Sequence, residues 1–256
     1  MLRSVVFIDL DHTLLEGPFE TAVFPIVLGE IAAQTGLSVE TLKELARQEN
    51  RARIAAARQQ PPAVVAAMDW DAIFAALAAR LGVRLQARAA DVVRQYARPP
   101  YIALHPGARQ ALQTLAAGPQ RLLLAATKGL RKYQLPVLAA LDLLPFFEEL
   151  ITPDSYGAMK QDLAFYGPWP QRAPLCIMVG DTYEDDVLPA SGFGFKTVWR
   201  LDAASQPGED LLDGAGPFER PARLPAYPGG GHTRPDAIIL GLAELPGVVE
   251  QLEHPA

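Results

Sequence analysis

Two acidic clusters in this chain each follow directly on a short apolar run, and this arrangement constrains the fold more than any other feature. The first run, residues 5–8, is rich in β-branched side chains and leads into Asp9 and Asp11. The second, residues 175–179, is followed closely by Asp181. Apolar runs of this length are typical of strands buried on both faces of a parallel sheet. Acids at the carboxyl ends of such strands lie where ligands bind in open α/β folds.

Further apolar runs predict the rest of the sheet. They occur at residues 122–126, 150–151, 197–199 and 237–240, and helical patterns lie between most of them. Strands that alternate with helices predict an α/β protein with a Rossmann-like three-layer core and a mostly parallel sheet. The segment 203–235 is rich in glycine and proline and predicts an irregular loop, to which we assign no function.

Residues 19–97 interrupt this alternation with helical periodicity. Apolar residues recur at helical spacing in four segments, which are 19–35, 38–58, 69–81 and 87–96. Asp69 is placed to cap the third of these helices. Such a set predicts a small α-helical domain. We therefore expect an α/β core formed by residues 1–16 and 100–256, and a helical domain formed by residues 17–99.

The composition excludes several classes of protein. The chain has 256 residues, of which 50% are hydrophobic, so it can bury a core and is not disordered. No apolar run approaches the roughly 18 residues of a membrane span, and the N-terminal run is too short for a signal peptide. The net charge of −6 argues against nucleic acid as the main partner, and the single Cys176 cannot form an internal disulfide. We expect a cytoplasmic protein that binds neither nucleic acid nor a membrane.

Charge is distributed unevenly along the chain. Residues 18–98 carry 10 Lys and Arg against 8 Asp and Glu, and the rest of the 23 basic and 29 acidic residues gives 13 against 21. Solvated helix faces are the simplest explanation of this mildly basic segment. The alternative is that some of its arginines meet an anionic ligand, and the candidates are Arg47, Arg51 and Arg53.

Taken alone, Asp9 and Asp11 are most simply a turn at the end of a strand with a helix cap, whereas the second acidic cluster fits a metal site better than a cap. Two carboxylates as close as Asp9 and Asp11 repel each other unless a cation or a proton lies between them. Residues 181–186 hold four acids, whereas a helix N-terminus needs only one or two. Mg²⁺, which prefers carboxylate and phosphate oxygens, is the expected ion.

Two further polar residues follow predicted strands. Thr127 comes directly after the run 122–126, where a hydroxyl and backbone amides could hold a phosphate oxygen. Lys160 lies shortly after the run 150–151. Taken alone, a threonine in this position is most simply a helix cap, and a lysine is most simply a solvated surface residue.

In this order, the four elements resemble the motifs of the haloacid dehalogenase (HAD) superfamily. The sequence matches D-x-D-x-T-L at residues 9–14, a hydroxyl at Thr127, a lysine at Lys160 and G-D-T-x-x-D-D-V at residues 180–187. The resemblance covers most of the chain. It implies a helical cap between the first and second motifs, which is where residues 17–99 lie.

The resemblance implies a role for each of these motifs. Asp9 would be the nucleophile that forms an aspartyl-phosphate. Asp11 would be the acid that protonates the leaving oxygen and then the base that activates water. Thr127 and Lys160 would bind the transferring phosphoryl group.

The same resemblance implies the ligands of Mg²⁺, which are Asp9, the backbone carbonyl of Asp11, Asp181 and a second acid of the last motif. Both Asp185 and Asp186 fit the family spacing at this last position. Asp186 is favoured, because the residues that follow it fit the family pattern.

Two positions depart from the pattern of the superfamily. His12 stands where the family most often has glycine, which predicts a different local shape. Lys128 stands where asparagine is commoner. It is interpreted as a solvated residue at the start of a helix, although its side chain could reach an anionic substrate.

The acid at position 11 separates the reactions of the superfamily. Dehalogenases and phosphonate-cleaving members lack an acid two residues after the nucleophile, and ion-pumping members carry a D-K-T-G-T signature that this chain lacks. The sequence therefore predicts a Mg²⁺-dependent phosphatase that acts on a small phosphorylated metabolite. The alternatives are a phosphomutase of the β-phosphoglucomutase kind and a non-catalytic binding or regulatory protein on the same fold.

Overall fold

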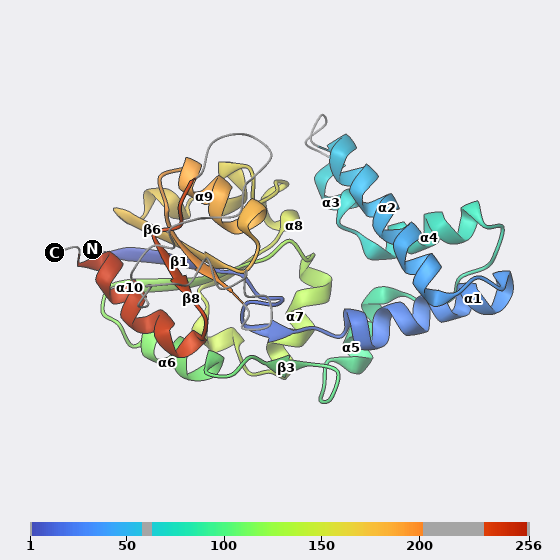
Figure 1. Ribbon diagram of the computed structural model, residues 1–256, viewed down its shortest axis with the longest axis horizontal. Helices are drawn as coiled ribbons and strands as arrows, with labels where there is room; N and C mark the ends of the chain where they lie inside the picture. Colours follow the sequence, from blue (N-terminus) through green and yellow to red (C-terminus); the bar gives the residue numbers. More distant parts are fainter. Residues whose placement is uncertain (1, 58–62, 202–232, 255–256) are drawn as a thin grey trace, which may run out of the picture.

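The computed structural model describes residues 2–57, 63–201 and 233–254 (Figure 1). The strands of its main sheet are β1 (Ser4–Ile8), β4 (Arg121–Ala126), β5 (Glu149–Ile151), β6 (Leu175–Gly180), β7 (Lys196–Arg200) and β8 (Ala237–Ile239). The helices that accompany them are α6 (Ala108–Ala116), α7 (Arg131–Ala140), α8 (Pro153–Tyr156), α9 (Leu188–Gly192) and α10 (Leu245–Glu253). Shorter helical turns are η3 (Leu144–Phe146), η4 (Leu163–Tyr166), η5 (Trp169–Gln171), η6 (Tyr183–Val187) and η9 (Leu242–Glu244).

The main sheet is parallel throughout and has the order β5-β4-β1-β6-β7-β8. Strand β1 lies in its centre, where Val6 is paired with Leu123 on one side and with Ile177 on the other. The predicted strand at residues 5–8 is confirmed and begins one residue earlier. The predicted α/β class, with a Rossmann-like core and a parallel sheet, is confirmed as well.

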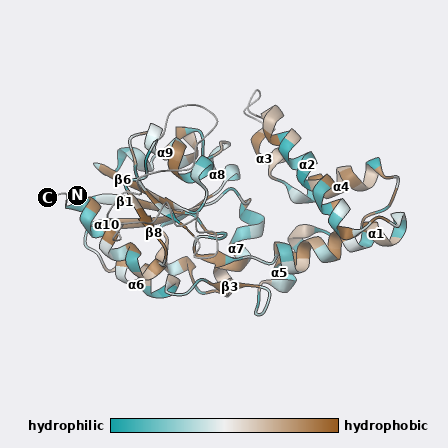
Figure 2. Cartoon of the chain, viewed as in Figure 1, coloured by the Kyte–Doolittle hydropathy of each residue, from teal (hydrophilic) through white to brown (hydrophobic). Residues whose placement is uncertain are grey.

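Both faces of the sheet are covered, which gives the three layers. Val6 and Ile8 belong to the hydrophobic cluster that also includes residues of α6, α7 and α10. Val5 and Phe7 point to the other face, where Phe7 lies 4.9 Å from the ring centroid of Tyr166. Figure 2 shows hydrophobic colours along the strands and hydrophilic ones over much of α2 and α7. The continuous apolar run of β1 is thus explained by burial on both faces.

A group of helices lies beyond the carboxyl ends of the strands, at one end of the structure (Figure 1). Its members are η1 (Phe19–Leu28), α1 (Gly29–Thr35), α2 (Val39–Ala57), α3 (Val64–Ala67), α4 (Trp70–Arg80) and α5 (Ala89–Tyr96). The predicted helical cap is confirmed as part of the fold. The first predicted helix is divided in two, because η1 is wound as a π-helix around Pro25, which has no amide hydrogen to donate.

A two-stranded antiparallel ladder joins the helical group to the sheet. It consists of β2 (Leu15–Glu16) and β3 (Ala103–Leu104), the two crossings of the chain between the parts. The amide of His105 extends the ladder by donating to the carbonyl of Leu14 over 2.9 Å. The sequence pattern did not predict this ladder. The division of the chain into domains at residues 16–17 and 99–100, which lie near its ends, stays a prediction.

Two further expectations concern the chain as a whole. Among the residues that the structure describes, no single helix is long and apolar enough to cross a membrane. The bent pair Phe19–Thr35 and Val39–Ala57, with 111° between its halves, reaches that length and composition only in combination. Most of the predicted irregular loop at 203–235 lies outside the described residues.

Candidate active site

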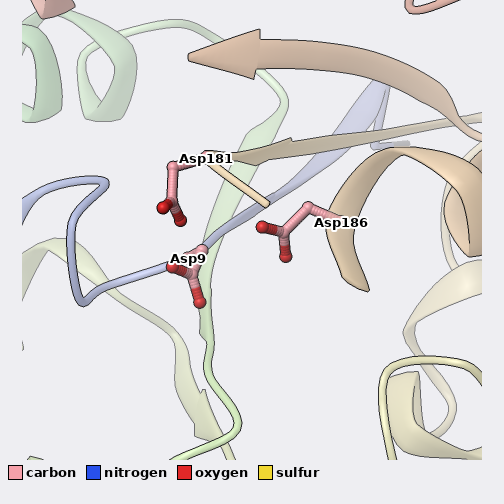
Figure 3. Close-up of side chains that lie close together, drawn as sticks. All are labelled: Asp9, Asp181 and Asp186. Atoms are coloured by element: carbon pink, nitrogen blue, oxygen red, sulfur yellow. The ribbon is translucent and has the colours of Figure 1, made fainter. Parts of the chain in front are cut away.

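Three aspartates converge at the carboxyl edge of the sheet. Asp9 follows β1 and Asp181 follows β6, its neighbour in the sheet, while Asp186 lies in η6 after the same strand. Figure 3 shows their carboxyl groups turned toward one another. One ligand atom from each lies within 4.8 Å of the others, so the three could hold a single metal ion.

Backbone bonds fix the positions of Asp9 and Asp186. The amide of Asp9 donates to the carbonyl of Val179 over 2.9 Å, which continues the ladder one residue beyond β1. The amide of Thr182 donates to Asp186 Oδ2 over 3.0 Å. Gly180 makes room for this carboxyl group, because a Cβ atom at position 180 would overlap it. The glycine before the second acidic cluster is therefore required by close packing against Asp186.

Lys160 lies between two of these carboxylates. Its Nζ atom is 2.5 Å from Asp9 Oδ1 and 2.6 Å from Asp186 Oδ1, and the residue is 1% exposed. Burial lowers the pKa of Lys160, but the charges of Asp186 and Asp9 outweigh burial and hold the pKa above its usual value. The lysine is therefore a buried cation, and the solvated surface residue that position 160 suggests in isolation is wrong.

A hydroxyl joins the two aspartates that follow the central strands. Thr13 Oγ1 lies 3.1 Å from Asp9 Oδ2 and 3.2 Å from Asp181 Oδ1, and Thr13 is fully buried. The sequence contained this threonine in the D-x-D-x-T-L motif, but no role was predicted for it. Its position four residues after Asp9 was the available signal.

The charges of this cluster do not balance. Three carboxylates, of Asp9, Asp181 and Asp186, face the single ammonium of Lys160. Burial raises the pKa of Asp181, and the charge of Asp9 adds to that effect. Burial also raises the pKa of Asp186, although Lys160 opposes it. A hard divalent cation would neutralise the excess, so the donor set fits Mg²⁺.

Asp11 is not part of this cluster and lines a cavity of about 350 Å³. Gln134, on α7, donates from Nε2 to Asp11 Oδ2 over 2.6 Å. Burial and the charge of Asp9 raise the pKa of Asp11 to about 6, and the Gln134 bond acts in the opposite direction. The sequence did not single out Gln134, because the helix that carries it follows a different strand and shows no motif.

The cavity lies between the sheet edge and the helical group. Its lining includes Asp11 and Gln134 on one side and Arg47 and Arg51 of α2 on the other. Of the three arginines proposed from the sequence, Arg53 does not line the cavity, and its Nε donates to Glu49 of its own helix over 2.9 Å. Arg47 and Arg51 therefore line this cavity, and their contact with an anionic ligand stays a prediction.

Thr127 lies where the sequence predicted, directly after β4. It is 2% exposed, and its hydroxyl accepts a bond from the amide of Gly129 over 3.1 Å. Lys128 forms an ion pair with Asp185, which also accepts from Gln161 over 2.5 Å. Asp185 is thus engaged with these two side chains, and Asp186 is the acid that faces Asp9 and Asp181.

His12 stands where the family pattern most often has glycine. Its backbone φ of 62° lies in the left-handed region, which favours glycine. The side chain of Arg200, from the end of β7, donates to the His12 carbonyl, and the imidazole lies 3.2 Å from Glu16. These contacts stabilise His12 in a backbone conformation that most residues other than glycine avoid.

Solved structures resemble this chain over nearly its whole length. No protein-family model and no curated protein matches the sequence. A HAD phosphatase from Thermococcus onnurineus superimposes with a TM-score of 0.66, covering 97% of this chain and 98% of its own, at 22% identity. The chain has the HAD fold. The resemblance predicted from the motifs is confirmed at the level of the fold.

Other proteins with the HAD fold match as well. The L-2-haloacid dehalogenase from Xanthobacter autotrophicus matches with a TM-score of 0.59 at 21% identity, covering 98% of this chain and 99% of its own. The HAD-hydrolase YfnB from Bacillus subtilis, bound to magnesium, matches with a TM-score of 0.55 at 18% identity over 78% and 89% of the two chains. Because these relatives include a phosphatase and a dehalogenase, the HAD fold alone does not specify the reaction.

Proposed function

We propose that this HAD-fold protein is a hydrolase of the HAD superfamily, a Mg²⁺-dependent phosphatase that cleaves a small phosphomonoester through an aspartyl-phosphate on Asp9. The helices of residues 17–99 would be a cap domain over the site, and the protein would act in the cytoplasm. The support comes from the grouping of Asp9, Lys160 and Asp11 around the edge of the sheet and the cavity beside it.

In this reaction Asp9 is the nucleophile. One of its carboxylate oxygens attacks phosphorus, a bond from Asp9 to phosphorus forms, and the bond from phosphorus to the leaving oxygen breaks. The ammonium of Lys160, 2.5 Å from Asp9 Oδ1, offsets the repulsion between carboxylate and phosphate. We assign the hydroxyl of Thr127 to an oxygen of the same phosphoryl group.

Asp11 moves the protons in both halves of the reaction. Its carboxyl group first donates a proton to the leaving alcohol oxygen. Its carboxylate then accepts a proton from the water that attacks phosphorus, which releases phosphate and regenerates Asp9. A pKa raised to about 6 suits a group that must act as acid and then as base near neutral pH.

Mg²⁺ would be held by the carboxylates of Asp9, Asp181 and Asp186 and by the backbone carbonyl of Asp11. When bound, the ion supplies positive charge that stabilises the phosphoryl oxygens. Two observations support this ion: the excess of buried carboxylates over Lys160, and the magnesium in the similar structure of YfnB.

The observation that carries the proposal is the position of Asp11. An alcohol leaving group needs a proton, whereas a halide leaves without one. Asp11 faces the cavity in which a leaving group would lie, and Gln134 orients it over 2.6 Å. An acid at this place can protonate an alcohol leaving group, a step that a halide leaving group does not require.

The test is phosphate release from 4-nitrophenyl phosphate, measured with Mg²⁺, with EDTA and with the Asp9→Asn variant. We expect turnover that requires Mg²⁺ and falls by about 10³-fold or more in Asp9→Asn. Turnover that persists in EDTA or in Asp9→Asn would contradict the proposal. Phosphate transfer to a phosphosugar, activated by a bisphosphate and without net release, would favour the phosphomutase instead.

A further inference from the structure

The cavity beside Asp11 has an aromatic wall. Its rings are those of Tyr133, Phe19, Trp70 and Phe24. The centroids of Tyr133 and Phe19 lie 5.4 Å apart, and those of Phe19 and Trp70 lie 5.9 Å apart. Trp70 continues the row to Phe24 at 5.3 Å. The wall therefore runs without a break from the helix α7, beside Asp11, into the helical group.

Only part of this wall is open to a ligand. Phe24 is 5% exposed and Tyr133 is 2% exposed, so both are packed behind the surface. Phe19 and Trp70 are half-buried, and they line the cavity. A group that enters the cavity next to Asp11 thus meets the rings of these two residues.

The polar side chains around the cavity already have protein partners. Arg47 pairs with Glu20 over 3.0 Å, and Arg51 pairs with Glu44 over 2.6 Å. Asn50 donates to a backbone carbonyl over 2.8 Å. A polyhydroxylated leaving group would share these side chains with their present partners, whereas an apolar ring needs no hydrogen bond from them.

The charged groups near the aromatic wall also come close to balancing. Glu20 is held by Arg47 and by Lys43, whose Nζ lies 2.5 Å from its carboxylate. Glu16 lies 3.1 Å from the imidazole of His105. The cavity therefore offers no strong attraction for a second anionic group on the substrate, and its accessible rings are the main feature left for recognition.

We propose that the preferred substrate is a phosphomonoester whose alcohol carries a planar apolar ring close to the phosphate oxygen. The ring would stack on Trp70 and Phe19 while the ester oxygen lies at Asp11. The cavity of about 350 Å³ lies at the small end of ligand sites, which fits one ring system and not an extended chain. This inference rests on the proposed phosphatase function and specifies its substrate class.

The test compares three esters of primary alcohols, which have similar intrinsic reactivity: 2-phenylethyl phosphate, propyl phosphate and glucose 6-phosphate. Each is assayed for phosphate release with Mg²⁺, and Asp9→Asn serves as the blank. We expect kcat/KM for the phenylethyl ester to exceed that for either of the other two by about 10-fold or more, since ring burial is worth this much.

Two variants of Trp70 test whether the aromatic wall causes the preference for the phenylethyl ester. Trp70→Ala should bring the ratio of kcat/KM between phenylethyl and propyl phosphate close to one, and Trp70→Phe, which keeps a ring, should retain part of it. Leu37→Ala is the matched control, because Leu37 is an exposed apolar residue of the helical group that does not line the cavity. Its ratio should equal that of the wild type.

The outcomes separate the two proposals. If Asp9-dependent turnover occurs without preference for the ring, or if the preference survives Trp70→Ala, the inference on the substrate is overturned and the phosphatase stands. The comparison of esters on the wild-type protein needs no variant, so misfolding of Trp70→Ala cannot hide a negative result. If none of the esters, nor 4-nitrophenyl phosphate, is turned over in an Asp9-dependent way, the proposed function itself fails.

Discussion

Gln134 donates a hydrogen bond to Asp11 Oδ2 over 2.6 Å, and this contact links helix α7 to the carboxyl group that faces the cavity. The bond stabilises the charged form of Asp11 and so opposes the effect of burial on its pKa. It also fixes the direction in which the carboxyl group points. A residue outside every sequence motif thus acts on the proposed acid and base.

Replacement of Gln134 is expected to move the pH dependence of catalysis. The general acid must be protonated, so kcat/KM should fall as the pH rises through the pKa of Asp11, which lies near 6. Gln134→Met removes the hydrogen bond that lowers the pKa of Asp11, so this pKa should rise. The pH at which kcat/KM falls should then move up by about one pH unit. Gln48→Met, on the exposed surface of α2, is the control and should leave this pH unchanged. An unchanged pH dependence in Gln134→Met would show that another group titrates.

Removal of the Lys160 ammonium is expected to destabilise the fold. Lys160→Met leaves Asp9 and Asp186 buried without their counter-ion, which costs about 3–5 kcal/mol in comparable buried pairs. The measurement is urea unfolding at pH 9 in EDTA, above the pKa of about 7 that Asp186 has in the wild type. Lys196→Met is the control, because Lys196 is 48% exposed in its pair with Asp236 and its loss should cost less than about 1 kcal/mol.

The sign of the pH effect on this variant follows from the same charges. The pKa of Lys160 is raised in the fold, so its stabilising contribution is complete below the usual lysine pKa and is lost only as the pH rises through the folded-state value. In the wild type the pKa of Asp186 is raised to about 7, and loss of the Lys160 ammonium in Lys160→Met should raise it further. The variant therefore takes up a proton at Asp186 at a higher pH than the wild type, and the stability difference between the two should shrink as the pH falls from about 9 toward 7. A difference that grows on acidification would contradict the ion-pair account.

Tyr133 is expected to hold the helical group against α7. Its hydroxyl donates to Asp69 Oδ1 over 2.8 Å and accepts from the amide of Asp71 over 2.9 Å. Lys132 adds an ion pair to Asp69 at 2.7 Å. Tyr133→Phe should cost about 1 kcal/mol and speed hydrogen exchange in the first turn of α4. Tyr156→Phe is the control. The hydroxyl of Tyr156 donates to Glu149 and not to α4, so its loss should leave hydrogen exchange in the first turn of α4 unchanged.

The sequence was informative wherever a local pattern determines the structure. The β-branched run of β1 predicted a central buried strand, and Asp69 before an apolar periodic segment predicted the start of α4, where it accepts from the Asp71 amide over 3.0 Å. The strands β2 and β3 have only two residues each, which is too short to show any alternation. They form because the two segments that connect the helical group to the main sheet lie side by side.

The site was predictable only as far as the edge of the sheet. Acids that follow parallel strands must meet at that edge, which the geometry of Asp9 and Asp181 bears out. The burial of Lys160 between two carboxylates, and the approach of Gln134 to Asp11, depend on how separate segments pack. No local spacing encodes such contacts, so the sequence could supply them only through a family resemblance or not at all.

Gly180 offers a test of the metal site that does not alter any acid. A Cβ atom at this position would overlap the carboxyl group of Asp186, so Gly180→Ala must displace that side chain from Asp9 and Asp181. We expect Mg²⁺-dependent turnover to fall by about 10²-fold and the Mg²⁺ concentration for half-maximal activity to rise, as displacement of a site residue by about 1 Å commonly causes. Gly192→Ala is the matched control, because nothing lies within 4 Å of a Cβ atom there, and it should retain wild-type turnover. Wild-type activity and Mg²⁺ dependence in a folded Gly180→Ala protein would show that Asp186 is not a ligand.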